Sequence, residues 1–186
     1  MKEESTDTII ATGPGYDIVV EKRARPVGAY PKKLLKLSHQ GTAILVAENS
    51  GRLILVSQFR PILNKRTLEF PGGIIRKGES PKAAAEREFT EEAGLTPSNI
   101  QYLGSFIASI GTSDERIYHY SGVCESLPIG LQALDAFSID DKDPEIKVLS
   151  CEENELNDLL RDGMLDDGKT ALAYLLWRRF IRGLDE

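Results

Sequence analysis

The sequence has few of the residues that build disulfides or zinc sites. It contains two cysteines, Cys124 and Cys151, and two histidines in 186 residues. The cysteines lie apart and lack CxxC spacing, which favours free thiols in a reducing compartment over a disulfide or a zinc site. His119, within the run IYHY, is interpreted as a residue on a strand face rather than as a catalyst.

The sequence also lacks a long hydrophobic run. No stretch approaches the roughly 20 apolar residues of a membrane-spanning helix. The N-terminus, MKEESTDTII, does not place a basic segment before an apolar one, as a signal peptide would. We therefore expect no membrane association and a cytoplasmic location.

The sequence has fewer basic residues than acidic ones. The chain has 23 Lys and Arg residues against 29 Asp and Glu residues, which gives a net charge of −6. General nucleic-acid binding needs a basic surface, so this balance argues against a nucleic-acid partner. It fits an enzyme that meets anionic small molecules through metal ions, because the ions supply the missing positive charge.

Hydrophobic patterning predicts several β-strands along the chain. Strands are expected at 16–20, 42–48, 53–59, 99–109, 116–123 and 145–150. The runs 42–48 and 53–59 are almost continuously apolar, as expected for strands covered on both faces. We expect residues 1–40 to form a β-rich arm and residues 41–186 to form the main domain.

Helical patterning completes the expected domain. Helices are expected at 82–93, 152–162 and 169–182. In the last helix, the residues expected to form a buried stripe are Leu172, Leu175, Leu176 and Phe180. A mixed sheet between helices follows from these elements, so the fold class is α/β, an α/β/α sandwich.

The segment from Gly73 to Leu95 has the clearest local signals. Ser80 is a good helix N-cap, and Pro81 suits the first helical position. Gly94 stands where a left-handed residue ends a helix. The segment is therefore expected to be a loop followed by a helix of about three turns.

Three glutamates share one face of this helix. Glu88, Glu91 and Glu92 stand at positions i, i+3 and i+4, and we call them the acid triplet. Like charges at these spacings repel, and Arg87 is expected to neutralise one of them at most. The triplet is either a solvated charged face or a site for Mg²⁺ or Mn²⁺, which prefer oxygen ligands.

The whole segment matches a known pattern. Gly73, Glu79, Arg87, the acid triplet and Gly94 stand at the fixed positions of the Nudix hydrolases without a departure. The chain therefore resembles a Nudix hydrolase. Softer matches at 58–60, 68–73 and 111–115 extend the resemblance to the ADP-ribose pyrophosphatase-like branch. The resemblance implies the same α/β/α sandwich.

The resemblance also implies a role for each matching residue. The metal ligands would be Glu88, Glu91, Glu92 and the main-chain carbonyl of Gly72, and the cofactor would be Mg²⁺, with Mn²⁺ as a possibility. Glu79 would pair with Arg87 and fix the loop against the helix. The residues implied to contact the substrate are Arg60, Glu69, Gly111 and Ser113. The catalytic base would come from the loop before the last strand, with Glu145 favoured and Asp143 as its rival.

The implied activity is metal-dependent hydrolysis of the diphosphate bond in a nucleoside diphosphate linked to another group. ADP-ribose or a related nucleotide sugar is the leading substrate, although Ile110 stands where ADP-ribose hydrolases typically carry proline. One alternative is hydrolysis of nucleoside triphosphates or dinucleoside polyphosphates, and another is a non-catalytic nucleotide sensor. The N-terminal arm implies a homodimer.

Overall fold

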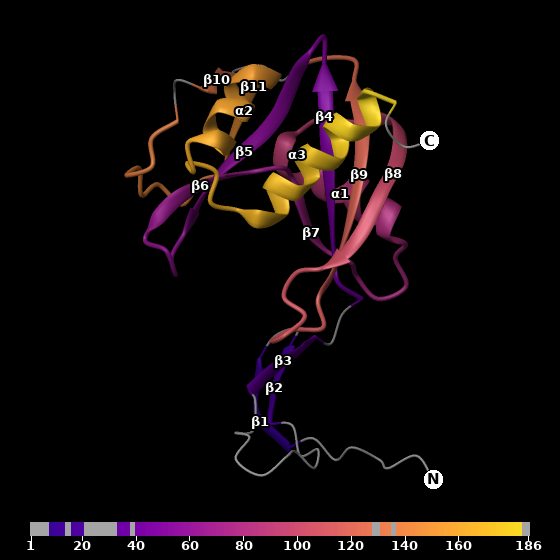
Figure 1. Ribbon diagram of the computed structural model, residues 1–186, viewed down its shortest axis with the longest axis vertical. Coiled ribbons are helices and arrows are strands. Elements are labelled where there is room, and N and C mark those ends of the chain that lie inside the picture. Colours follow the sequence, from indigo (N-terminus) through magenta and orange to yellow (C-terminus); the bar gives the residue numbers. More distant parts are fainter. Residues whose placement is uncertain are drawn as a thin grey trace.

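The computed structural model describes residues 8–13, 16–20, 33–37, 40–127, 131–134 and 137–183. Figure 1 shows a layered main domain and, below it, a small separate sheet near the N-terminus. The small sheet is antiparallel and has the order β1-β2-β3, formed by Thr8–Gly13, Tyr16–Val20 and Lys33–Leu37. The boundary expected at residues 40 and 41 falls between this sheet and the main domain, and it stays a prediction.

The main domain is built on an eight-stranded mixed sheet. Its principal order is β10-β11-β5-β4-β9-β8, with β6 paired to β5 and β7 paired to β4. The strands are β4 (Thr42–Asn49), β5 (Arg52–Arg60), β6 (Lys65–Glu69), β7 (Gly72–Ile74), β8 (Pro97–Ile107), β9 (Arg116–Cys124), β10 (Gln132–Ala133) and β11 (Lys147–Glu152). The pairs β4–β9 and β10–β11 are parallel. The other pairs of this sheet are antiparallel.

Helices cover both faces of this sheet, as Figure 1 shows. Helix α1 (Pro81–Ala93) lies behind the sheet, whereas α2 (Glu153–Arg161) and α3 (Gly168–Ile181) lie in front. Each face has its own hydrophobic cluster, one around Phe89 of α1 and the other around Tyr174 and Trp177 of α3. The central residues of β4 and β5 are buried, because both faces of these strands are covered. The expected α/β/α sandwich with a mixed sheet is confirmed.

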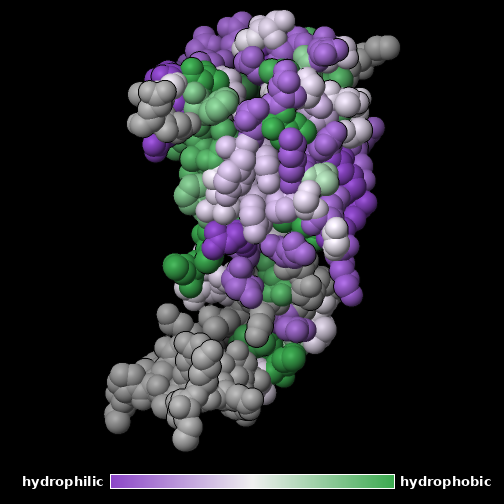
Figure 2. All heavy atoms as spheres, turned by 90° about the vertical axis from the view of Figure 1, so that its right-hand side faces the viewer, coloured by the Kyte–Doolittle hydropathy of each residue, from purple (hydrophilic) through white to green (hydrophobic). Residues whose placement is uncertain are grey.

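The expected buried stripe of α3 is wrong. Thr170, Ala173, Tyr174 and Trp177 are the buried residues, whereas Leu175 and Phe180 are 48% and 40% exposed. The helix carries apolar residues on more than one face, so periodicity alone did not select the face that packs. Small residues at 170 and 173 sit on the packed face, where they allow close approach to the sheet. In Figure 2, hydrophobic side chains gather toward the α3 side and hydrophilic ones toward the α1 side.

Five strands were missing from the expected ones, namely β1, β3, β6, β7 and β10. β3 forms one edge of the small sheet, and β10 pairs in parallel with β11. The main-chain N–H of Leu37, at the end of β3, donates to Asp114 Oδ1 at 2.9 Å. This bond joins the small sheet to the loop between β8 and β9. None of the described helices is long and apolar enough to cross a membrane.

Candidate active site

The helix that carries the acid triplet begins and ends where its local signals place it. Ser80 Oγ accepts a hydrogen bond from Ala83 N at 3.2 Å, and Pro81 is the first residue of α1. Gly94 has a φ of 69° and donates its N–H to Thr90 O at 3.1 Å. The residues of α1 that are buried against the sheet are Ala84, Ala85, Phe89 and Ala93. The triplet therefore lies off the packed stripe of the helix.

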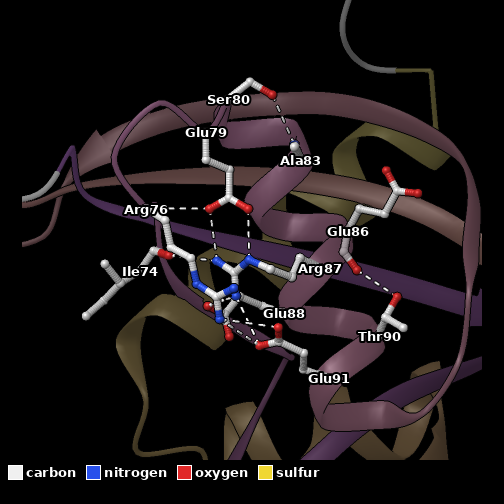
Figure 3. A network of polar contacts seen from close by, with 10 residues as sticks. All are labelled: Ile74, Arg76, Glu79, Ser80, Ala83, Glu86, Arg87, Glu88, Thr90 and Glu91. Atoms are coloured by element: carbon white, nitrogen blue, oxygen red, sulfur yellow. Dashed lines mark hydrogen bonds and ion pairs between the residues drawn. The ribbon is translucent and has the colours of Figure 1, made fainter.

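Arg87 is the centre of a polar network beside the triplet (Figure 3). Its guanidinium donates to both carboxylate oxygens of Glu79, at 2.8 and 3.0 Å, and to Ile74 O at 3.0 Å. It also donates to Glu88 at 2.6 Å and to Glu91 at 3.1 Å. The expectation that Arg87 neutralises one triplet carboxylate at most is therefore wrong. Its planar fork reaches several acceptors at once.

The loop before α1 adds a second cation. Arg76 contacts both oxygens of Glu91 at 3.3 Å, and its main-chain N–H donates to Glu79 Oε2 at 2.9 Å. Hydrogen bonding from Arg87 lowers the pKa of Glu79 to about 2, so this carboxylate is ionised at neutral pH. The structure thus brings Glu79 and Arg87 together in the arrangement that the resemblance implies.

Two glycines let strand β7 pack closely, Gly73 against the triplet and Gly72 against β4. A Cβ on Gly73 would lie 2.5 Å from the carboxyl carbon of Glu88. A Cβ on Gly72 would lie 2.5 Å from the main-chain oxygen of Ala43. Neither contact is tolerable, so only glycine fits at either position without a shift of its neighbours. The main chain of β7 therefore lies directly against the acids.

Glu92 is a partly buried member of the triplet that bonds to the main chain of β7. Its Oε2 accepts a hydrogen bond from Gly72 N at 3.0 Å. Burial raises the pKa of Glu92 to about 7, the Gly72 N–H opposes this shift, and the nearby charges of Glu88 and Glu69 add to it. Glu92 is therefore partly protonated at neutral pH, mainly because it is buried.

Arg60 and Glu69 form a second ion pair next to these acids. Glu69 is 7% exposed, and its carboxylate accepts hydrogen bonds from Arg60 Nε at 2.7 Å and from Thr67 Oγ1 at 2.6 Å. Hydrogen bonding to Glu69 raises the pKa of Arg60, and the charges of Asp167 and Glu92 contribute in the same direction. Arg60 is thus a fixed cation close to Glu92.

The donor set fits a hard divalent cation in its chemistry. Within the described residues, no three His, Cys, Asp or Glu side chains are grouped to hold an ion as they now lie. The contacts explain this, because Glu88 and Glu91 are turned to Arg87 and Glu92 is turned to Gly72 N. Carboxylate oxygens are nevertheless the ligands that Mg²⁺ and Mn²⁺ prefer, and the pKa of Glu92 is raised first by burial and then by the nearby charges of Glu88 and Glu69. Arg87 bonds one oxygen of Glu88 and one of Glu91, so each carboxylate keeps a second oxygen that could bind an ion.

Other expected site residues lie outside these contacts. Asp143 Oδ1 accepts the main-chain N–H of Glu145 at 3.0 Å, and both residues are exposed in the loop before β11. Ser113 Oγ accepts from Glu115 N at 3.0 Å, so it stabilises its own loop. A Cβ on Gly111 would meet open space. The choice between Glu145 and Asp143 as the base, and the substrate contacts of Gly111 and Ser113, stay predictions.

The sequence interpretation missed a buried arginine that holds the loop before β11. Arg66 is 1% exposed, and it donates to Ser57 Oγ at 2.9 Å and to Ser57 O at 2.8 Å. It also donates to the main-chain oxygens of Asp143 and Glu145, and its own N–H bonds Ile139 O at 3.0 Å. One signal for its burial was available in the sequence. Arg66 stands two residues before the apolar Leu68, and residues at i and i+2 share a strand face, so Arg66 lies on the same face of β6 as Leu68.

The arrangement of acids, glycines and arginines is matched by a family comparison. The family model of the NUDIX domain matches residues 37–171. The chain belongs to the Nudix family. The expected identification as a Nudix pyrophosphatase enzyme is confirmed with it.

Individual relatives agree with this assignment. An ADP-ribose pyrophosphatase of Bacillus subtilis (strain 168) is 29% identical over 164 residues, which are 88% of this chain and 85% of that protein. A methanol dehydrogenase activator of Bacillus methanolicus is 27% identical over 164 residues, again 88% and 85% of the two chains. A crystal structure of an ADP compounds hydrolase has the same fold, with a TM-score of 0.68 and 19% identity over 100% of this chain and 99% of that one.

Proposed function

We propose that this Nudix protein hydrolyses the diphosphate bond of ADP-ribose or a related nucleotide sugar. The products are a nucleoside monophosphate and a phosphorylated sugar. The relative named ADP-ribose pyrophosphatase supports this substrate class. The supporting observation within the chain is the cluster of Glu69, Glu88 and Glu92 around Gly72 and Gly73, with the pKa of Glu92 raised to about 7.

The cofactor in this proposal is Mg²⁺, or Mn²⁺, held by Glu88, Glu91, Glu92 and the Gly72 carbonyl. When bound, such ions neutralise a diphosphate and lower the pKa of water. Arg60 lies beside the acids and supplies a fixed positive charge for a phosphate oxygen. Glu69 orients Arg60 through two hydrogen bonds, so the guanidinium presents its remaining N–H groups to the substrate.

A carboxylate of the loop before β11 accepts the proton of the attacking water in this proposal. Glu145 and Asp143 are the two candidates, and Arg66 binds the main-chain oxygen of each. This loop also bonds to β6 through Ile139 O and Arg66 N. This attachment holds the loop against β6, the strand that ends at Glu69.

The test is hydrolysis of a substrate panel by the wild type, Glu92→Gln and Glu86→Gln with Mg²⁺. Glu86 is an exposed residue of the same helix, so its substitution is a matched control. The panel holds ADP-ribose, ADP-glucose, GDP-mannose, NADH, a diadenosine polyphosphate and an oxidised nucleoside triphosphate. We expect turnover of ADP-ribose or ADP-glucose that falls on the order of 100-fold or more in Glu92→Gln and is unchanged in Glu86→Gln.

Three other results would overturn the proposal. Turnover of triphosphates or diadenosine polyphosphate alone would move the chain to another branch of the family. Tight ADP-ribose binding without turnover would make the chain a sensor. Full activity with Mg²⁺ in Glu92→Gln would remove the acid triplet from the mechanism. Single variants Glu145→Gln and Asp143→Asn then decide which loop acid is the base.

The assembly in this proposal is a cytoplasmic homodimer that uses the N-terminal sheet. Strand β1 is an edge strand of that sheet, and its Ile9 and Ile10 are 57% and 51% exposed. An apolar edge strand is suited to pairing with another chain. Light scattering coupled to gel filtration at micromolar protein should give a dimer that Ile10→Lys weakens. A wild-type monomer would contradict this part of the proposal.

A further inference from the structure

The loop before α1 carries two adjacent basic residues, Arg76 and Lys77, and both are exposed. Arg76 turns its side chain to the acid triplet (Figure 3), and its Nη2 lies 3.3 Å from each oxygen of Glu91. The side chains of Arg76 and Glu91 are 61% and 48% exposed, so an ion in solution can reach this pair. Arg76 is not one of the residues that carry the Nudix resemblance, so its role has to come from its contacts.

The main chain of Arg76 is anchored by Glu79. Arg76 N donates to Glu79 Oε2 at 2.9 Å, and Glu79 N donates to Arg76 O at 3.0 Å. Glu79 is itself held by two hydrogen bonds from Arg87. These bonds use no atom of the Arg76 side chain. A substitution of that side chain therefore leaves the anchors of the loop in place.

The two arginines cover Glu88 and Glu91 differently. Arg87 Nη1 donates to Glu88 Oε1 and to Glu91 Oε2, which leaves the other oxygen of each carboxylate without a bond from Arg87. At Glu91 this other oxygen is Oε1, and Arg76 contacts it. Both oxygens of Glu91 therefore face an arginine. Glu91 is thus the member of the triplet at which an arginine competes most directly with an incoming ion.

An ion that binds Glu91 needs the oxygen atoms that Arg76 contacts. Two cations on one carboxylate also repel each other. The ion must therefore displace the Arg76 guanidinium or bind against its repulsion, and either lowers the affinity for the ion. Displacement is easy, because the guanidinium is largely exposed and water can solvate it. An exposed ion pair of this kind changes an equilibrium constant by up to about fivefold.

We propose that Arg76 sets the metal affinity of the acid triplet by competing with the ion for Glu91. Arg76 is a positioning residue in this account, because it acts through Glu91. In the metal-free protein it offsets the charge of Glu91 and holds the carboxylate toward the loop. When an ion takes Glu91, the guanidinium turns to solvent. The inference rests on the proposed function, because it takes Glu91 as a ligand of Mg²⁺ or Mn²⁺.

The test measures metal binding to protein that has been stripped with EDTA and then freed of it. Binding of Mn²⁺ is followed by loss of the electron paramagnetic resonance signal of the free ion, and binding of Mg²⁺ by competition with Mn²⁺. The variants are Arg76→Met, Arg76→Lys and Lys77→Met. Lys77→Met removes the same charge from the next residue of the loop, so it is the matched control. Urea unfolding of the metal-free variants checks that each is folded.

We expect Arg76→Met to bind Mn²⁺ about three- to fivefold more tightly than the wild type, the effect of one lost exposed ion pair. Lys77→Met should change the affinity by less than about twofold, because solvent and salt screen an exposed charge. Arg76→Lys keeps the charge and should return most of the way to wild-type affinity. In the Glu91→Gln background, Arg76→Met should no longer tighten binding, because the carboxylate in competition is absent.

The sign of the change separates competition from a merely structural role. If Arg76 only held the loop in place, its loss would loosen the site and weaken metal binding. Weaker binding by Arg76→Met would therefore overturn the inference. Equal affinities of Arg76→Met and Lys77→Met would do the same, as would an undiminished tightening in the Glu91→Gln background.

Failure of the proposed function gives a different pattern. Wild-type protein that binds no Mn²⁺, or binds it no better than Glu92→Gln, refutes the proposed metal site and the role of Arg76 together. Wild-type protein that binds Mn²⁺ more tightly than Glu92→Gln, with no gain in Arg76→Met, refutes the role of Arg76 alone.

Discussion

Replacement of Arg66 by methionine tests whether a buried guanidinium organises the loop that is proposed to supply the base. Arg66 bonds Ser57 on β5 with one side of its fork and the main-chain oxygens of Asp143 and Glu145 with the other. Its nearest carboxylate, that of Asp141, is 3.8 Å away. The guanidinium therefore acts mainly by cross-linking main-chain acceptors of the sheet and the loop.

The size of the effect follows from the burial of these acceptors. Ser57 is 2% exposed, so its hydroxyl and carbonyl lose partners that water cannot replace, at about 1–3 kcal/mol each. Asp143 and Glu145 are exposed, and water can solvate their carbonyls. Removal of a buried charge returns part of its desolvation cost. We expect Arg66→Met to lower the free energy of unfolding by about 2–4 kcal/mol.

The catalytic effect should exceed what stability alone explains. At a temperature where Arg66→Met remains folded, release of the loop should lower kcat/KM for ADP-ribose by on the order of 10- to 100-fold. Lys65→Met is the matched control, because Lys65 precedes Arg66 and makes a surface ion pair with Asp166 at 2.7 Å. Such pairs contribute about 0–1 kcal/mol. The measurements are urea unfolding and steady-state kinetics, and equal effects of the two variants would refute the reasoning.

Three further predictions concern the acids and the thiols. Because the pKa of Glu92 rises from 4.5 to about 7 on folding, the folded state binds more protons between these values. Metal-free stability should therefore fall as the pH rises through this window, by about 1–2 kcal/mol rather than the full ~3.4 because the side chain is partly exposed. Urea unfolding with EDTA at about pH 5 and pH 8 measures this fall, and Glu92→Gln should lack it. Gly73→Ala should displace the Glu88 carboxyl and lower kcat/KM at least ~10-fold at a stability cost of about 1 kcal/mol, and near-wild-type activity would contradict the close contact. Burial raises the pKa of Cys124 to about 11 and of Cys151 to about 12, so iodoacetamide at neutral pH should label neither until urea unfolds the protein.

The local part of the candidate site could be read from the sequence. The ends of α1 depend on Ser80, Pro81 and Gly94, and each acts within one helical turn of its own position. The same spacing rules place the acid triplet on one face. These predictions succeeded because they need no knowledge of which element packs on which.

Features that depend on packing between distant elements could not be predicted from the sequence. The face by which α3 packs could not be predicted, since the helix has apolar residues both on the face of Tyr174, which is buried, and on the face of Leu175, which is exposed. Arg66 looks like a surface residue until β6 is placed between β5 and the loop before β11. His119 was assigned correctly to a strand, but its 1% exposure depends on how α3 closes over β9.

The arginine network offsets much of the negative charge of the acid triplet. Arg87 offsets Glu88 and Glu91, while two hydrogen bonds to Glu79 and one to Ile74 O fix its guanidinium in place. An ion that took both glutamates would leave Arg87 with these other partners, so its charge would not be stranded. Glu92 differs, because a main-chain N–H is its hydrogen-bond partner and burial raises its pKa to about 7. Among the described contacts, Glu92 is thus the member of the triplet that pairs with a main-chain N–H, whereas Glu88 and Glu91 pair with Arg87.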